Sequence, residues 1–288
     1  MVGWGGLAAA SYPGGYDASI GAGRASAACG TLAAVACLDY LMSLRLYVES
    51  PLSAELEFTL PEDAARHVQV RRLQPGDDLR LFDGAGGEWH AQVTRMGKRD
   101  VDVRVGTHEA VDRELPFDLE IALGMPTNER MDALIEKATE LGVAAIQPLQ
   151  TERSVLRLDG DRAAKRVAHW QAVAVGASEQ SGRTRVPVVA PVRNLGAWLA
   201  AQPDPAPQAG RFVMSTGSAP PLARAATMAP HGRWLALSGP EGGLTADEEA
   251  AAAARGFTRI SLGGLILRAD TAPLAWLAQM AVLLWPSA

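Results

Sequence analysis

The hydrophobic period of the chain changes at Pro116, and this change limits the possible folds more than any other feature of the sequence. Over residues 44–113, short stretches of alternating apolar and polar residues are separated by turn-forming runs such as Pro75–Asp78. A period of two with closely spaced turns predicts a small all-β barrel or sandwich. After Pro116, strand-like runs alternate with helical patterns, which predicts a parallel sheet covered by helices on both faces. We therefore expect two domains, residues 42–115 and 116–288.

The second domain has the clearer pattern. Apolar residues recur at helical spacing over residues 129–141, Thr127 or Asn128 can cap this helix, and Gly142 can end it. The predicted strands are residues 117–125, 144–150, 212–217, 234–239 and 257–263, and the other predicted helices are residues 161–178, residues 245–255 and a C-terminal helix. In the first domain, only residues 61–73 have a helical pattern. Because ligands of open parallel sheets bind beyond the carboxyl ends of the strands, the loops after these strands are the candidate sites.

Composition restricts the chemistry available to the chain. Its formal net charge is −5, which excludes binding of nucleic acid through bulk positive charge and leaves only local contacts, mainly from arginine. Both cysteines lie in the first 41 residues, so the rest of the chain has no thiolate nucleophile and no cysteine metal ligand. The five histidines are scattered, without metal-ligand spacing. We therefore expect no metal site.

Residues 1–41 are rich in glycine, alanine and serine, unlike the rest of the chain. Their apolar run, residues 25–38, lacks a strongly basic leader and is too short and small-residued to span a bilayer well. We interpret residues 1–41 as a disordered leader, or as an upstream extension with Met42 as the true start. Nothing else indicates secretion or membrane insertion, so we expect a cytoplasmic protein.

The stretch LSGPEGGLTADEE, residues 237–249, joins a predicted strand to a predicted helix through a glycine-rich loop. The phosphate-binding patterns GxGxxG and GxxxxGK[ST] are absent from the chain. Within the loop, Glu241 would repel a pyrophosphate, and Pro240 has no N–H to donate to one. These residues favour a ligand with positive charge beside an adenosine, such as S-adenosylmethionine. The alternative is an ordinary turn before a well-capped helix, since Thr245 and Glu248 can form a capping box.

A second stretch, ISLGGLILRADTAPLAWL, joins the last predicted strand to the C-terminal helix. Gly263 and Gly264 break the strand pattern, and Asp270 or Thr271 can cap the helix. Arg268 and Asp270 would therefore be held at the carboxyl edge of the sheet. The alternative is that Asp270 is only a helix cap and Arg268 only its neighbour.

Five motifs, in the order LIEKATELGV, PLQTERSV, ASEQSGRTRVP, LSGPEGGLT and LGGLILRADTA, resemble the RsmE family of 16S ribosomal RNA uridine-N3 methyltransferases. The segment HVQVRRLQPGDDLRLFDGAGGEW is similar to the PUA-like module of that family. The resemblance implies an α/β-knotted SPOUT methyltransferase domain, preceded by a small all-β PUA-like barrel that binds RNA. It also implies that the protein uses S-adenosylmethionine to methylate N3 of a uridine in 16S ribosomal RNA of the small ribosomal subunit.

The resemblance further implies an obligate homodimer. The C-terminal helix favours this independently, because it is apolar on almost every face. A helix that is merely buried within its own chain is the alternative.

The resemblance also assigns roles to individual residues. The residues that it implies line the cofactor pocket are Met214, Ser215, Thr216, Leu237, Gly239, Glu241, Gly242, Gly243, Leu262, Gly263 and Leu267. Those expected to contact RNA or the partner subunit are Arg153, Glu179, Gln180, Arg183 and Arg185. In the β domain, Arg71 and Arg72 are candidate RNA contacts, with a solvated surface as the alternative. The chain departs from the family motif at Leu265, where the family has arginine, and at Asp270, where it has glutamate.

Methylation of N3 requires the loss of a proton from a weakly acidic imide, and negative charge then spreads onto the flanking carbonyl oxygens. We assign Arg268 to stabilising this charge and Asp270 to acting as the base or orienting it, with Glu241 positioning the cofactor loop. Three other functions stay open: a nucleotide-dependent oxidoreductase, a catalytically silent RNA-binding protein, and the same chemistry on another RNA.

Overall fold

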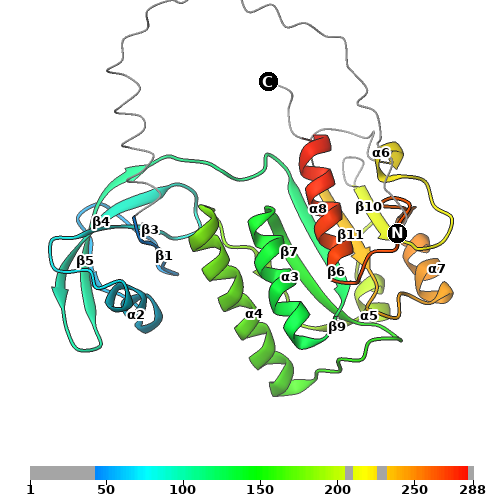
Figure 1. Cartoon of the computed structure of the whole chain (residues 1–288), viewed down its shortest axis with the longest axis horizontal. Coiled ribbons are helices and arrows are strands. Elements are labelled where there is room, and N and C mark those ends of the chain that lie inside the picture. Colours follow the sequence, from blue (N-terminus) through cyan, green and yellow to red (C-terminus); the bar gives the residue numbers. More distant parts are fainter. Residues whose placement is uncertain (1–42, 205–209, 226–231, 285–288) are drawn as a thin grey trace, which may run out of the picture. The chain divides into compact units, whose positions relative to one another are not determined.

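The computed structural model describes residues 43–204, 210–225 and 232–284, so the predicted leader lies outside the described residues. Within these residues, hydrogen-bonded strands form a five-stranded sheet and a seven-stranded sheet. The first sheet lies entirely before Pro116 and the second entirely after it, as the change of period predicted (Figure 1).

The five-stranded sheet forms the β domain. In spatial order its strands are β1 (Arg45–Tyr47), β3 (Asp78–Phe82), β4 (Glu88–Met96), β5 (Val101–Glu109) and β2 (Glu57–Thr59). β1 and β3 are parallel, and the other neighbouring strands are antiparallel. Helix α2 (Glu62–Val70) lies within the predicted segment, and its Ala65 and Val68 pack into the core of this sheet with Leu81. The predicted β domain is confirmed.

The seven-stranded sheet forms the α/β domain, and all of its paired strands are parallel. In spatial order they are β12 (Thr258–Ile260), β10 (Gly210–Met214), β11 (Arg233–Ser238), β6 (Asp118–Gly124), β7 (Val143–Gln150) and β8 (Val188–Val189), with β9 (Arg193–Asn194) also paired to β7. The helices are α3 (Asn128–Glu140), α4 (Gly160–Ser181), α5 (Leu195–Ala200), α6 (Leu222–Ala225), α7 (Ala246–Ala254) and α8 (Thr271–Leu284).

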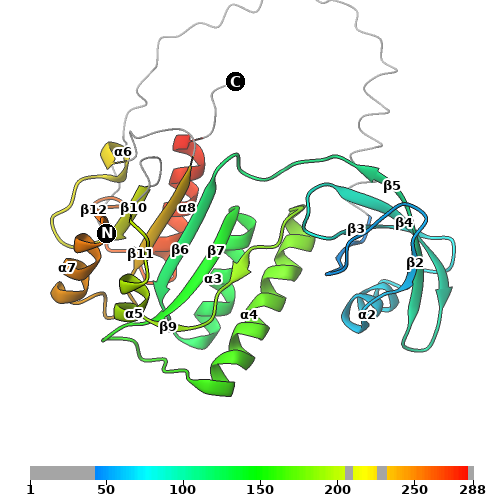
Figure 2. The ribbon, with the colours of Figure 1, turned by 180° about the vertical axis from the view of Figure 1, so that it is seen from behind.

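These helices cover both faces of the sheet. Helices α3, α4 and α8 share one hydrophobic core with the sheet, while α5 and α7 share another with residues such as Leu149, Val213 and Leu237 (Figures 1 and 2). The predicted parallel sheet with helices on both sides is confirmed.

The predicted helix signals have different outcomes. Thr127 is the N-cap residue of α3, but its side chain makes no capping hydrogen bond. Gly142 follows the end of that helix with φ +84°, a conformation that favours glycine. At α7 the capping box forms, because the N of Glu248 donates to Oγ1 of Thr245 at 3.2 Å and the N of Thr245 donates to Oε2 of Glu248 at 2.9 Å.

Helix α8 is apolar on its buried side and on its exposed side. Trp276, Leu277 and Met280 are completely buried, whereas Val282 is 79% exposed and Leu283 is 47% exposed. Packing within the chain therefore explains only one side of the helix. In the part of the chain that the structure describes, no helix combines the length and the apolar character that a membrane span needs.

Candidate functional site

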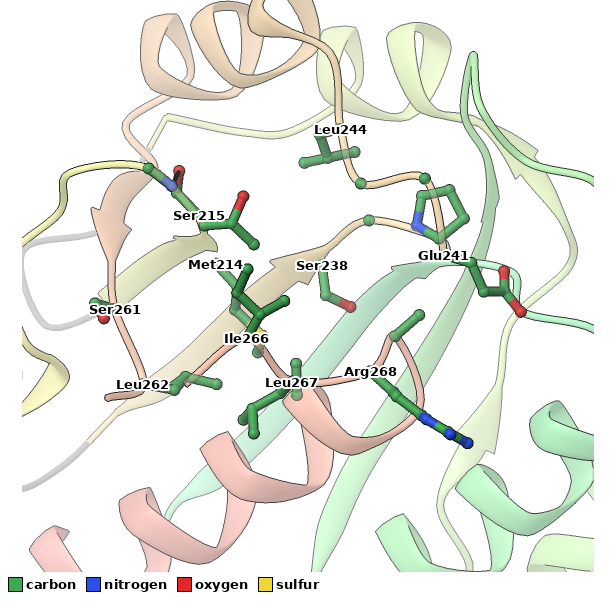
Figure 3. A pocket seen from close by; sticks show the side chains of 18 of the residues that line it. Met214, Ser215, Ser238, Glu241, Leu244, Ser261, Leu262, Ile266, Leu267 and Arg268 are labelled. Atoms are coloured by element: carbon green, nitrogen blue, oxygen red, sulfur yellow. Dashed lines mark hydrogen bonds between the residues drawn. The ribbon is translucent and has the colours of Figure 1, made fainter. Parts of the chain in front are cut away.

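Three loops that follow neighbouring strands line one pocket (Figure 3). They are residues 215–217 after β10, residues 239–244 after β11 and residues 261–269 after β12. Because these strands are parallel neighbours, their carboxyl ends lie at the same edge of the sheet. The pocket volume of ≈ 730 Å³ lies in the range of small-molecule sites. The predicted cofactor residues that line it are Met214, Ser215, Thr216, Glu241, Gly239, Gly242, Gly243, Leu262, Gly263 and Leu267.

Leu237 is the exception among the predicted cofactor residues. Its side chain is fully buried in the core with Val213 and Leu235, because successive residues of a strand point to opposite faces. The next residue, Ser238, lines the pocket instead. Its buried Oγ has no hydrogen-bond partner among the described residues. We therefore correct the expectation for Leu237, and we add Ser238 to the candidate site.

Glycines of the 239–244 loop are required by the shape of the loop itself. A Cβ on Gly239 would lie 2.6 Å from both the carbonyl C of Gly243 and the N of Leu244. The N of Gly243 donates to the O of Pro240 at 2.8 Å, and Gly243 has φ +69°. The loop therefore closes on itself so tightly that no side chain fits at Gly239.

Glu241 is held from outside the loop. Its Oε1 accepts a hydrogen bond from the N of Thr127 at 3.2 Å and lies 3.5 Å from Nη1 of Arg130. Both partners belong to the start of α3, where the helix dipole also favours a carboxylate. These contacts join the 239–244 loop to the start of α3 and balance the negative charge of Glu241 with Arg130.

A second carboxylate, Glu249 on α7, also lines the pocket. It accepts a hydrogen bond from Oγ of Ser215 at 3.2 Å and lies 2.9 Å from Nη2 of Arg259. In the sequence it is one acid among three in the first turn of a helix, where acids are expected for electrostatic reasons alone. No local pattern distinguished it.

Apolar side chains complete the wall of the pocket. Figure 3 shows Met214, Ile266 and Leu267 on one side of Ser238, with Glu241 and Arg268 on the other. The site therefore combines an apolar surface with two carboxylates, the three arginines Arg130, Arg153 and Arg268, glycine backbone and the unpaired hydroxyl of Ser238. No group of three or more His, Cys, Asp or Glu that could hold a metal ion occurs among the described residues.

The two predicted catalytic residues lie in different surroundings. Arg268 lines the pocket and is exposed, and its carbonyl O accepts hydrogen bonds from the N of Thr271 and of Ala272 at the start of α8. Asp270 is not among the lining residues, and its buried Oδ1 has no hydrogen-bond partner among the described residues. The structure therefore places Arg268 at the pocket and does not include Asp270 in its lining.

Arg153 lies at the pocket rather than on a separate surface. Its Nη1 donates to the carbonyl O of Gly242 at 2.9 Å, and its side chain lines the pocket. The other predicted RNA contacts Arg71, Arg72 and Arg185 are exposed, as is Gln180.

Arg183 and Glu179 have structural roles. Arg183 is 7% exposed, and its guanidinium donates to the carbonyl O of Val143 at 2.6 Å and to Oε2 of Glu114 at 2.6 Å. Glu179 accepts a hydrogen bond from the N of Tyr47 at 2.9 Å, and burial raises the pKa of its carboxyl. Both side chains are therefore engaged within the chain, and their contact with RNA or a partner subunit stays a prediction.

Models of two protein families match the chain. One is described as an RNA methyltransferase domain and matches residues 113–281, and the other is described as an RNA methyltransferase PUA domain and matches residues 60–106. Two relatives are both named ribosomal RNA small subunit methyltransferase E. The relative from Synechocystis is 34% identical over 85% of this chain and 80% of its own length. The relative from Bacillus subtilis is 32% identical over 75% of this chain and 86% of its own length.

Solved structures agree with these matches. The ribosomal RNA small subunit methyltransferase E of Neisseria gonorrhoeae, bound to S-adenosylmethionine, is 35% identical with a TM-score of 0.77 and matches 84% of this chain and 98% of its own. A putative methyltransferase from Legionella pneumophila, in complex with the same cofactor, is 29% identical with a TM-score of 0.78, and the match covers 83% of this chain and 97% of its own. Together with the parallel sheet and the β domain, these matches confirm the SPOUT fold with a PUA-like domain. The chain belongs to the RsmE family of ribosomal RNA small subunit methyltransferases.

Proposed function

We propose that the protein transfers the methyl group of S-adenosylmethionine to N3 of a uridine in 16S ribosomal RNA. The observation that carries the proposal is that three loops, each following one of three neighbouring strands, line the same pocket, and that Arg268 is one of its lining residues. The names of the relatives support the ribosomal RNA substrate, and the two cofactor-bound structures support the methyl donor.

The residues of the pocket fit S-adenosylmethionine. Apolar side chains such as Leu262 and Ile266 suit the adenine ring, and the unpaired Oγ of Ser238 can bond to a polar group of the donor. Glu241 and Glu249 are paired with Arg130 and Arg259, so their charge does not select between ligands. The cofactor bound in the two similar structures supports S-adenosylmethionine over a nucleotide of an oxidoreductase. When bound, the cofactor supplies an electrophilic methyl group.

Residues of the chain then act on the uridine. We assign Arg268 to stabilising the negative charge that develops on the carbonyl oxygens of the base after loss of the N3 proton. Asp270 keeps its assignment as the base or as the group that orients the base, because its Oδ1 has no hydrogen-bond partner among the described residues and can accept a proton or a hydrogen bond. Arg71, Arg72 and Arg185 are exposed, as phosphate contacts require.

The test is mass spectrometry of 16S ribosomal RNA from cells with and without this gene, together with methyl transfer by the purified protein. Loss of 3-methyluridine in the deletion strain, and its return with the gene, is the expected result. Persistence of the modified base, with no other methyltransferase to account for it, would exclude the proposal. RNA binding without methyl transfer would instead identify a catalytically silent relative, and transfer only to a different RNA would identify another substrate.

We also propose that the protein acts as a homodimer in the cytoplasm, where ribosomal RNA is available in bacteria. Val282 and Leu283 of α8 are exposed, and Leu265 and Ile266 at the pocket are each 84% exposed. Exposed apolar side chains on a helix end and on the neighbouring site are typical of an interface between subunits.

Val282→Glu is expected to convert the dimer to a monomer at micromolar concentration, because a buried unpaired carboxylate raises the dimer Kd by roughly tenfold or more. Light scattering during gel filtration measures the mass. The matched control is Val70→Glu, since Val70 is 73% exposed on α2 of the β domain, and it is expected to leave the mass unchanged. A wild-type protein that is monomeric at all concentrations would contradict the proposal.

A further inference from the structure

The motif TERS, residues 151–154, follows β7 and forms a turn. The N of Thr151 donates to Oγ of Ser154 at 3.0 Å, and both residues are buried. The two residues between them, Glu152 and Arg153, are exposed. Because Thr151 and Ser154 are buried at the ends of the turn, Glu152 and Arg153 are available to contact neighbouring segments.

Arg153 lies beside the glycine-rich loop. Its Nη1 donates to the carbonyl O of Gly242 at 2.9 Å and reaches the carbonyl O of Leu244 at 3.5 Å. A Cβ on Gly242 would be 3.1 Å from the Cβ of Arg153, so the two segments are in close contact. One guanidinium thus bridges the carbonyls on both sides of Gly243.

Glu152 holds the same region by a separate contact. Its N donates to Oε1 of Glu248 at 2.8 Å, and Oε2 of Glu248 accepts from the N of Thr245 directly after the loop. On the other side, Glu241 accepts a hydrogen bond from the N of Thr127. The loop is therefore held from two directions, by the chain that follows β6 and by the chain that follows β7.

We propose that Arg153 is a positioning residue for the methyl donor, because it holds the 239–244 loop in the shape that receives the donor and is not a contact to RNA. The proposal rests on the proposed function, since it takes S-adenosylmethionine as the ligand of this pocket. A guanidinium is suited to the role because its planar fork presents several donors in fixed directions, whereas the ammonium of lysine is a single point charge.

Arg153→Ala is expected to raise the Kd for S-adenosylmethionine by roughly tenfold, as measured by calorimetry, through loss of a charge-assisted hydrogen bond at an exposed site. The kcat at saturating cofactor is expected to stay close to the wild-type value, whereas the KM for S-adenosylmethionine is expected to rise. Arg153→Lys is expected to restore part of the affinity. In the free protein, hydrogen exchange of the amides of residues 239–245 is expected to be faster in Arg153→Ala, a result that requires no cofactor.

The matched control is Arg162→Ala. Arg162 is exposed on α4, and no hydrogen bond or ion pair joins its side chain to another described residue. This variant is expected to have the same affinity for S-adenosylmethionine as the wild type and the same rate of hydrogen exchange at the amides of residues 239–245.

Unchanged affinity and unchanged exchange in Arg153→Ala would overturn the proposal. Weaker RNA binding at an unchanged cofactor Kd would also overturn it, because Arg153 would then contact RNA. A wild-type protein that binds no S-adenosylmethionine would refute the proposed function, whereas the exchange measurement would still decide whether Arg153 holds the loop.

Discussion

Replacing Arg268 with alanine is expected to lower kcat by roughly 100-fold or more while the Kd for S-adenosylmethionine changes only a few-fold. The reason is that the proposed role of Arg268 begins only when the base loses its N3 proton and negative charge develops on its oxygens. A guanidinium that is already in place stabilises this charge without reorganisation. In the ground state the base is neutral, so the guanidinium stabilises it much less. Single-turnover methyl transfer to small subunits, with calorimetry for the donor, measures the two quantities.

Arg268→Lys provides the control for charge. It keeps the positive charge but loses the planar fork of donors, so we expect a kcat between those of alanine and wild type. If Arg268→Ala weakens binding of S-adenosylmethionine as much as it lowers kcat, then Arg268 is a cofactor residue and its assigned role is wrong. Because Arg268 is exposed, both variants are expected to fold and melt like the wild type, which a thermal melt measures.

Replacing Gly239 with alanine is expected to raise the Kd for S-adenosylmethionine by roughly 10- to 100-fold, the equivalent of about 1–3 kcal/mol of overpacking. A methyl group there would lie 2.6 Å from backbone atoms of Gly243 and Leu244, and backbone cannot move aside as a flexible side chain does. The 239–244 loop must therefore open, which changes the pocket wall while the core of the sheet stays intact. Calorimetry with the donor and a thermal melt of the free protein measure the two effects.

Gly176→Ala is the matched control for this substitution. Gly176 lies inside α4, where a Cβ would meet nothing within 4 Å, and alanine is the better helix former. This variant is expected to melt at the same temperature or slightly higher, with an unchanged Kd. Full cofactor affinity in Gly239→Ala would show that the pocket does not depend on the closed form of the loop.

The elements of the fold could be predicted because local pattern determines them. The period of α3 places Met131, Leu134 and Ile135 on one face, and all three are buried. The short strands β8 and β9 were missed because two residues carry no period, and only their pairing with β7 defines them.

The candidate site was predictable only where the backbone itself carries the signal. Glycines and a proline mark the 239–244 loop in the sequence, and the structure places that loop at the pocket. The partners of long side chains are not local: Glu249 meets Ser215 from 34 positions away, and Arg183 reaches Glu114 across 69. For this reason charge alone could not separate an arginine that is buried from one that is free to bind RNA.

The 239–244 loop is anchored by residues that follow β6 and β7, and its pocket is closed by residues that follow β10 and β12. The pocket therefore forms, and can bind a ligand, only when segments from nearly the whole α/β domain are folded together. A ligand that binds only this assembled state stabilises the domain by mass action as its concentration exceeds its Kd. In a cell rich in methyl donor, occupancy of the pocket would then protect the whole domain from proteolysis.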